Sequence, residues 1–204
     1  MSLLLLLQGA AIGFSIAAPV GPIGALTIRR TLAQGKAVGL ATGMGAATAD
    51  AIYGAVAGFG LSAVTETLIE HAGWLRLLGG AFLVYLGLKT FTAKPTTSDA
   101  CTPARGLAGT YGSTLALTLA NPATILSFVG IFAGLGIAGT QSTYLRAALF
   151  VTGVFLGSAL WWLILSWSVA HLRSRLAPGA LRWVNRISGL VIAGFGALAL
   201  SAAI

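Results

Sequence analysis

Asp50 is the residue of this sequence best placed to do chemistry, because it is the only acidic residue well inside an apolar segment. In a membrane helix it would lie roughly 18 Å into a hydrocarbon core of about 30 Å. A carboxyl group at that depth is costly and should face a cavity or the protein interior. Its helical face fits this expectation because it carries only small side chains: Gly43, Ala47, Gly54 and Ala57. We expect Asp50 to act as a proton carrier. The alternative is a structural aspartate that is protonated or hydrogen-bonded to a neighbouring helix.

Two prolines interrupt the first apolar segment, in the stretch "IAAPVGPIGAL" at residues 16–26. A proline supplies no backbone N–H and clashes with the carbonyl four residues earlier. Pro19 and Pro22 therefore leave the carbonyls of Ser15 and Ala18 without their helical partners. Since an unpaired backbone group in hydrocarbon costs several kcal/mol, we expect the backbone around Gly21 to face a cavity rather than lipid.

A second break is expected at a comparable depth in the other half of the chain, in "LTLANPATILSF" at residues 117–128. Pro122 releases the carbonyl of Thr118, and Asn121 offers both donors and an acceptor. A single proline in a span usually gives only a kink, but matched breaks in two halves are typical of transporter substrate sites. The predicted substrate- or ion-binding residues are those of the two breaks together with Asp50: Ser15, Ala18, Pro19, Gly21, Pro22, Asp50, Thr118, Asn121 and Pro122.

The elements that must position these residues are membrane helices. Of the 204 residues, 57% are hydrophobic and 8% are charged, and the mean hydropathy is +0.92. Soluble domains carry about 25% charged residues. The net charge of +8 could suggest nucleic-acid binding, but the basic residues lie in short loops between apolar segments. The sequence therefore predicts an all-α polytopic membrane protein that binds no nucleic acid.

Six segments are apolar over about 20 residues, the length that crosses a bilayer: 4–28, 38–63, 73–92, 111–137, 144–170 and 184–203. A long polar connection separates the first three from the last three. We expect a three-helix repeat at 1–92, a cytoplasmic linker at 93–110 and a second three-helix repeat at 111–204. Connections 1–2, 3–4 and 5–6 hold ten of the twelve Lys and Arg residues, which predicts that they are cytoplasmic and that both termini face outward.

The two halves share a pattern of residues at a constant offset of 109: Trp74/Trp183, Gly80/Gly189 and Gly87/Gly196. Because each half has three spans, an odd number, the repeats must be inverted relative to each other in the membrane. Inverted 3+3 repeats recur in secondary transporters. The alternative is that Gly and Trp coincide because membrane helices are rich in both.

Several other residues are expected to serve packing or anchoring. GxxxG pairs allow helices to approach closely: Gly9/Gly13, Gly39/Gly43, Gly54/Gly58, Gly130/Gly134 and Gly153/Gly157. Trp161 and Trp162 lie deep in the fifth span, where we expect them to pack against lipid or the core. Arg29 and Arg30 are expected to anchor the inner end of the first span.

Three motifs in order, "GFSIAAPVGPIGALTIRRTLAQG", "GMGAATADAIYG" and "NPATILSFVGIFAGLG", resemble the lysine exporter (LysE/RhtB-type) translocators along the whole chain. The resemblance implies a multi-pass exporter of amino acids or related metabolites in the bacterial inner membrane, built from six spans as an inverted repeat and assembled as a homodimer. It singles out Gly21 with Pro22, Asp50, and Asn121 with Pro122. Many members carry a lysine directly after Asn-Pro, where this chain has an alanine, so the role of that lysine cannot be transferred.

These patterns predict a secondary-active, proton-coupled exporter whose partners are a small-molecule substrate, protons and the lipid bilayer. The alternative is a passive channel or metal-ion carrier of the same superfamily, although a channel would show rings of polar lining residues. No cofactor or metal is expected. An enzyme is not expected either, because a serine nucleophile needs an adjacent base and both histidines, His71 and His171, lie outside the spans.

Overall fold

The chain is all-helical in the computed structural model, which describes residues 2–19, 21–59, 70–92, 106–121, 124, 128, 144–173 and 178–201. The all-α class is confirmed over these ranges, which contain seven helices and no strand: α1 (Ser2–Ala17), α2 (Pro22–Gln34), α3 (Lys36–Gly58), α5 (Ala72–Phe91), α6 (Gly106–Leu119), α8 (Tyr144–Arg173) and α9 (Pro178–Ser201).

Fewer helices meet the membrane-span criteria than the six expected. In the described part of the chain, Tyr144–Leu172 and Arg182–Ser201 are long and apolar enough, and α1 with α2 adds a third if the bent pair is one span. The others fall short for reasons visible in their sequences. α6 ends after 14 residues, while Asp50 and five glycines lower the hydropathy of α3.

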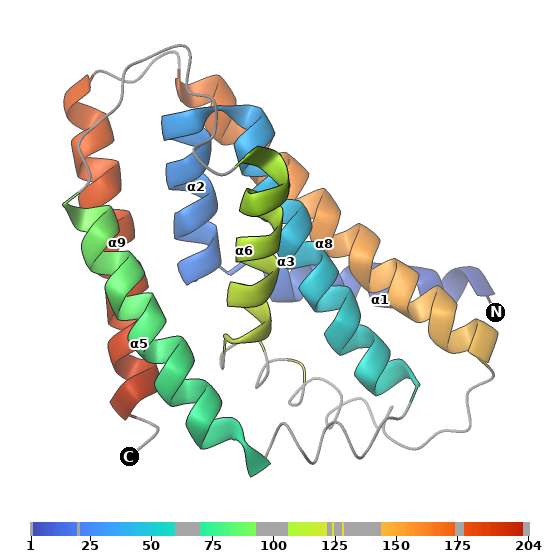
Figure 1. Ribbon diagram of the computed structural model, residues 1–204. Helices are drawn as coiled ribbons and strands as arrows, with labels where there is room; N and C mark the ends of the chain where they lie inside the picture. The colour runs from blue at the N-terminus through green and yellow to red at the C-terminus, as the bar shows by residue number, and fades with distance from the viewer. Residues whose placement is uncertain are drawn as a thin grey trace.

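The helices pack in two groups that α2 connects. Figure 1 shows α5 and α9 side by side at one edge, with α2 next to α9. On the other side of α2, α3 packs against both α6 and α8, and α1 packs mainly along α8. Large apolar side chains cover the outer faces, among them Leu78, Leu145, Trp167, Trp183 and Leu190, all more than half exposed. An apolar surface of this extent suits contact with lipid.

Glycines bring α5 and α9 into backbone contact. A Cβ atom on Gly80 would lie 2.9 Å from the carbonyl oxygen of Gly196, and one on Gly87 would lie 2.7 Å from that of Gly189. The contacts are therefore crosswise: Gly80, the earlier residue of the α5 pair, meets Gly196, the later residue of the α9 pair, and Gly87 meets Gly189. Any larger side chain here would push the two backbones apart.

The same close approach joins α1 to α8. Both GxxxG pairs at this contact allow the close packing that the sequence predicts: Gly9/Gly13 and Gly153/Gly157. A Cβ atom on Gly157, for example, would overlap the backbone carbonyl of Ala10. The small residues remove the side-chain layer between the helices, so α1 lies directly on α8.

The first apolar segment is not one straight helix, because α1 and α2 meet at an angle of 78°. α1 ends at Ala17, and Pro22 opens α2, where its missing N–H is no loss because the first N–H groups of a helix have no partner in any case. Between them, the Gly21 N–H donates to the Pro19 carbonyl at 2.9 Å, and the Ala25 N–H donates to the Gly21 carbonyl at 3.0 Å. The break predicted at these prolines is thus present as a sharp turn.

Candidate functional site

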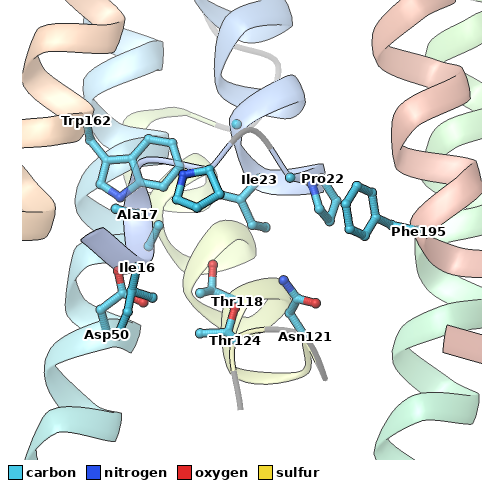
Figure 2. Close-up of a pocket in the computed structure, with 14 residues that line it drawn as sticks. Ile16, Ala17, Pro22, Ile23, Asp50, Thr118, Asn121, Thr124, Trp162 and Phe195 are labelled. Atoms are coloured by element: carbon cyan, nitrogen blue, oxygen red, sulfur yellow. The ribbon is translucent and has the colours of Figure 1, made fainter. Parts of the chain in front are cut away.

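A pocket of about 170 Å³ lies at the turn between α1 and α2 (Figure 2). Its walls come from both sides of that turn and from α3, α6, α8 and α9. An engineered protein cavity of about 150 Å³ holds benzene, so the space suits a small metabolite. Most of the lining is apolar, and four side chains bring polar groups to it: Asp50, Thr118, Asn121 and Thr124.

The pocket brings together residues that the sequence singled out from three distant segments. Six of the nine predicted site residues line it: Pro19, Gly21, Pro22, Asp50, Thr118 and Asn121. Ser15 and Ala18 are not among the lining residues, and the side chain of Ser15 is exposed on α1. Pro122 lies outside the described residues. The binding role of these residues remains a prediction.

Asp50 is 3% exposed, and a hydrogen bond from α8 holds it. The Ser158 hydroxyl donates to Asp50 Oδ2 at 2.6 Å, and the Trp162 indole N–H donates to Ser158 Oγ at 3.1 Å. The small residues beside Asp50 make this possible, since a Cβ atom on Gly43 would clash with Trp162. The small-residue face of α3 therefore serves to bring α8 close to the carboxyl group.

The end of α6 differs in detail from the expected break at Pro122. The helix ends earlier, at Leu119, whose carbonyl accepts a hydrogen bond from the Tyr53 hydroxyl of α3. The Thr118 carbonyl, expected to lack a partner, accepts the backbone N–H of Asn121 at 3.1 Å. Tertiary contact with α3 and a local turn thus satisfy the carbonyls that end the helix. The side chains of Thr118 and Asn121, rather than only their backbone, then reach the pocket.

The first break lies at the two prolines, as the sequence predicted. Pro19 and Pro22 supply no N–H to the carbonyls of Ser15 and Ala18. The Ala18 N–H itself still donates to the Phe14 carbonyl at 2.9 Å, so α1 retains its hydrogen bonding up to the turn. The turn and the first residues of α2 form one side of the pocket, and Figure 2 shows Pro22 and Ile23 above and to the right of Asp50 in this view.

Arg30 connects three helices rather than only anchoring the end of one. Its guanidinium donates to Thr114 Oγ1 at 2.8 Å and to Thr42 Oγ1 and Ser113 Oγ at 3.3 Å each. These bonds tie α2 to α3 and α6. One turn further along α6 from Thr114 is Thr118, at the pocket.

Sequence reasoning missed two side chains that matter to this geometry. Trp162, expected only to pack, lines the pocket and forms a hydrogen bond, whereas Trp161 does pack, edge-on against Phe14 at 5.4 Å between ring centroids. Ser158 was not singled out at all, although it directly follows Gly157 of a predicted packing pair near the middle of α8. A polar residue in the small-residue face of a long apolar helix is the sequence feature that could have identified Ser158.

The chain resembles known proteins over nearly its whole length. The LysE type translocator family model matches residues 14–203. YcgF of Bacillus subtilis (strain 168), whose name refers to amino acid efflux, is 28% identical over 190 residues, covering 91% of this chain and 90% of the relative. YahN of Escherichia coli (strain K12), described as an uncharacterized membrane protein, is 28% identical over 174 residues, covering 83% of this chain and 77% of the relative. No solved structure matches the chain significantly.

The family model covers residues 14–203 and therefore includes every residue that lines the pocket. Translocators move a solute across a membrane rather than convert it chemically. The family match therefore indicates a transporter rather than an enzyme. The chain belongs to the LysE type translocator family.

Proposed function

We propose that this protein is a secondary-active exporter that moves an amino acid or a similar small zwitterion out of the bacterial cytoplasm in exchange for protons. The observation that carries the proposal is the pocket itself, where a buried carboxyl group, Asp50, shares a small and mostly apolar space with a broken helix. The family match and the efflux name of YcgF support the direction of transport and the class of cargo.

The two ends of the pocket complement the two charges of an amino acid. The start of α2 contributes Pro22, Ile23 and Gly24, and the positive end of a helix dipole favours a carboxylate. Asp50, when ionised, favours an ammonium group. Thr118 and Asn121 add hydroxyl and amide groups between these ends. Half-helix ends that point at a substrate carboxylate are a recurring device in secondary transporters.

Helix packing supports the proposed inverted repeat of 1–92 and 111–204, joined by the linker at 93–110. Exchanging the first and fourth, second and fifth, and third and sixth spans preserves the four main helix contacts of the described residues. The α5–α9 and α3–α8 contacts then map onto themselves, and α1–α8 maps onto α6–α3. The crosswise contact of Gly80 with Gly196 and Gly87 with Gly189 is what a two-fold relation requires.

In this architecture six spans cross the bacterial inner membrane, and the halves rock so that the pocket opens to each side in turn. Connections 1–2, 3–4 and 5–6 lie in the cytoplasm, both termini face outward, and two copies form a homodimer. Asp50 holds the substrate cation when ionised and releases it on protonation. No step requires a cofactor or a metal ion.

The test compares bacteria that lack or express the gene while they are fed dipeptides, with intracellular and extracellular amino acids measured over time. Expression should lower the intracellular level of at least one amino acid and raise its level outside. That amino acid is then loaded into proteoliposomes, where an imposed pH gradient should drive its movement against its own gradient. Movement only down the gradient, whatever the pH difference, would favour the passive channel instead.

A further inference from the structure

A chain of three buried groups leads from the wall of the pocket back to Asp50. The Trp162 indole lines the pocket and donates to Ser158, which donates to Asp50 Oδ2. These side chains are 4%, 0% and 3% exposed, respectively. Both donors lie one turn apart on α8 and the acceptor lies on α3, so the chain of hydrogen bonds crosses between two helices.

When Asp50 is ionised, the chemistry of the three groups gives this series of hydrogen bonds a single direction. An indole N–H can only donate, and a serine hydroxyl has one proton to give. Because Ser158 gives its proton to Asp50, its oxygen is the acceptor for Trp162. Within the described ranges no other side chain or backbone group donates to Asp50. Oδ2 therefore accepts from Ser158, and Oδ1 is the oxygen of Asp50, a pocket-lining residue, to which no described group donates.

We propose that Ser158 and Trp162 are positioning residues that keep Oδ2 a permanent hydrogen-bond acceptor, so that Asp50 gains and loses its proton at Oδ1. The inference rests on the proposed function and adds the chemical class of the substrate group that meets Asp50. Ionised Oδ1 binds a cationic amine of the substrate; once Oδ1 takes a proton, the carboxyl group is neutral and the amine leaves with its own charge. One oxygen then holds either a proton or a substrate ammonium, never both.

Among the residues that the structure describes, few other titratable groups face Asp50. On its own helix, Tyr53 lies one turn away and donates to the Leu119 carbonyl. α1 has no titratable side chain, and α8 has none between residues 147 and 170. α6 contributes Tyr111, which donates to Thr48 Oγ1, and α2 contributes Arg29 and Arg30, the latter bonded to the hydroxyls described above. The Ser158 hydroxyl is thus the group through which this series of hydrogen bonds positions the Asp50 carboxyl group.

Infrared spectroscopy on the full-length protein in lipid vesicles tests the assignment without a substrate. The protein has only four acidic residues, so the difference from an Asp50→Asn variant isolates the carboxylic acid C=O band of Asp50. If the proton sits on Oδ1, the C=O is at Oδ2 and accepts from Ser158. Ser158→Ala should then move the band to higher frequency and raise the pH of half-protonation by about one unit, a tenfold change in the equilibrium.

Trp162→Phe keeps an aromatic wall on the pocket, leaves the Ser158 hydroxyl in place and should produce smaller shifts in the same direction. It also carries the test if Ser158→Ala does not fold. α8 offers matched controls. Ser166→Ala removes an equally buried hydroxyl for which the described residues provide no hydrogen-bond partner, and Trp161→Phe changes the neighbouring indole. Both controls should leave the Asp50 band and its midpoint unchanged.

An Asp50 band that stays at the native frequency and midpoint in both Ser158→Ala and Trp162→Phe would overturn the inference. If proton-driven transport by the native protein is nevertheless observed, the export proposal stands without it. Conversely, the expected shifts in a protein that moves no amino acid would uphold the position of the proton and refute export.

Discussion

The α5–α9 pair and the pocket region are built on opposite principles. Between α5 and α9, glycines such as Gly87 and Gly189 bring backbone against backbone, and the contact leaves no space for a single added carbon. Around the pocket, a helix is interrupted, a carboxyl group is buried, and hydroxyls of α3, α6 and α8 are held in hydrogen bonds.

This difference indicates which part of the protein is rigid and which part can change conformation. Close packing resists deformation because any shift opens gaps or creates clashes. A buried carboxyl group, by contrast, can change charge and so change which arrangement of its neighbours is favourable. We therefore regard the α5–α9 contact as a rigid frame and the surroundings of Asp50 as the part that can change, and three substitutions test that division in order of expected effect.

Gly189→Ala should have the largest effect on stability. Its new Cβ would lie 2.6 Å from the backbone nitrogen of Phe91, so α5 and α9 must separate, at a cost of about 3 kcal/mol. Gly194→Ala on the same helix is the matched control, since nothing lies within 4 Å of its Cβ position. Thermal unfolding in detergent should show a clearly lower midpoint for the first variant only. Equal unfolding midpoints for the two variants would show that the α5–α9 contact is not rigid.

Arg30→Gln should have the next largest effect. The guanidinium joins α2 to hydroxyls of α3 and α6, and hydrogen bonds of a charged group are worth about 1.5–3 kcal/mol. Lys36→Gln, at an exposed position at the start of α3, serves as the control. The same unfolding assay should separate the two. A stability loss as small as that of the control would mean that the Arg30 bonds contribute little.

Tyr53→Phe should have a smaller effect, of about 1 kcal/mol, because it removes only the hydroxyl that binds the Leu119 carbonyl at the end of α6. The ring keeps its contact with Phe128, at 5.5 Å between centroids. Tyr85→Phe removes a hydroxyl from an exposed tyrosine of α5 and should be neutral. Hydrogen exchange at the end of α6 should rise in the first variant and not in the second.

The sequence alone predicts the parts of this molecule that depend on local chemistry. A proline removes an N–H whatever surrounds it, so the turn at Pro19 and Pro22 could be predicted. An acid in an apolar segment must find a polar environment, so the burial of Asp50 in a pocket wall could be predicted as well. Glycine spacing likewise predicted that Gly9 and Gly13 allow close helix packing, although it did not predict that their partner is α8.

What could not be predicted depends on how distant helices pack. Ser158 is 108 residues from Asp50, and Thr114 is 84 residues from Arg30. No local sequence pattern predicts that either pair will form a hydrogen bond. The end of α6 also differs from the prediction because the Tyr53 hydroxyl stabilises a helix end at Leu119, before Pro122 is reached. The 78° angle between α1 and α2 likewise depends on neighbours, since two prolines allow a bend without fixing its size.

Proton-driven transport by Asp50→Asn tests the central claim most directly. The variant protein is placed in proteoliposomes with an imposed pH gradient and the amino acid identified by dipeptide feeding. Asparagine keeps the size of the side chain and an oxygen that can accept from Ser158, so the fold should be retained while proton exchange is lost. We predict that the pH gradient no longer drives transport by this variant. Transport at the native rate under the same gradient would contradict it.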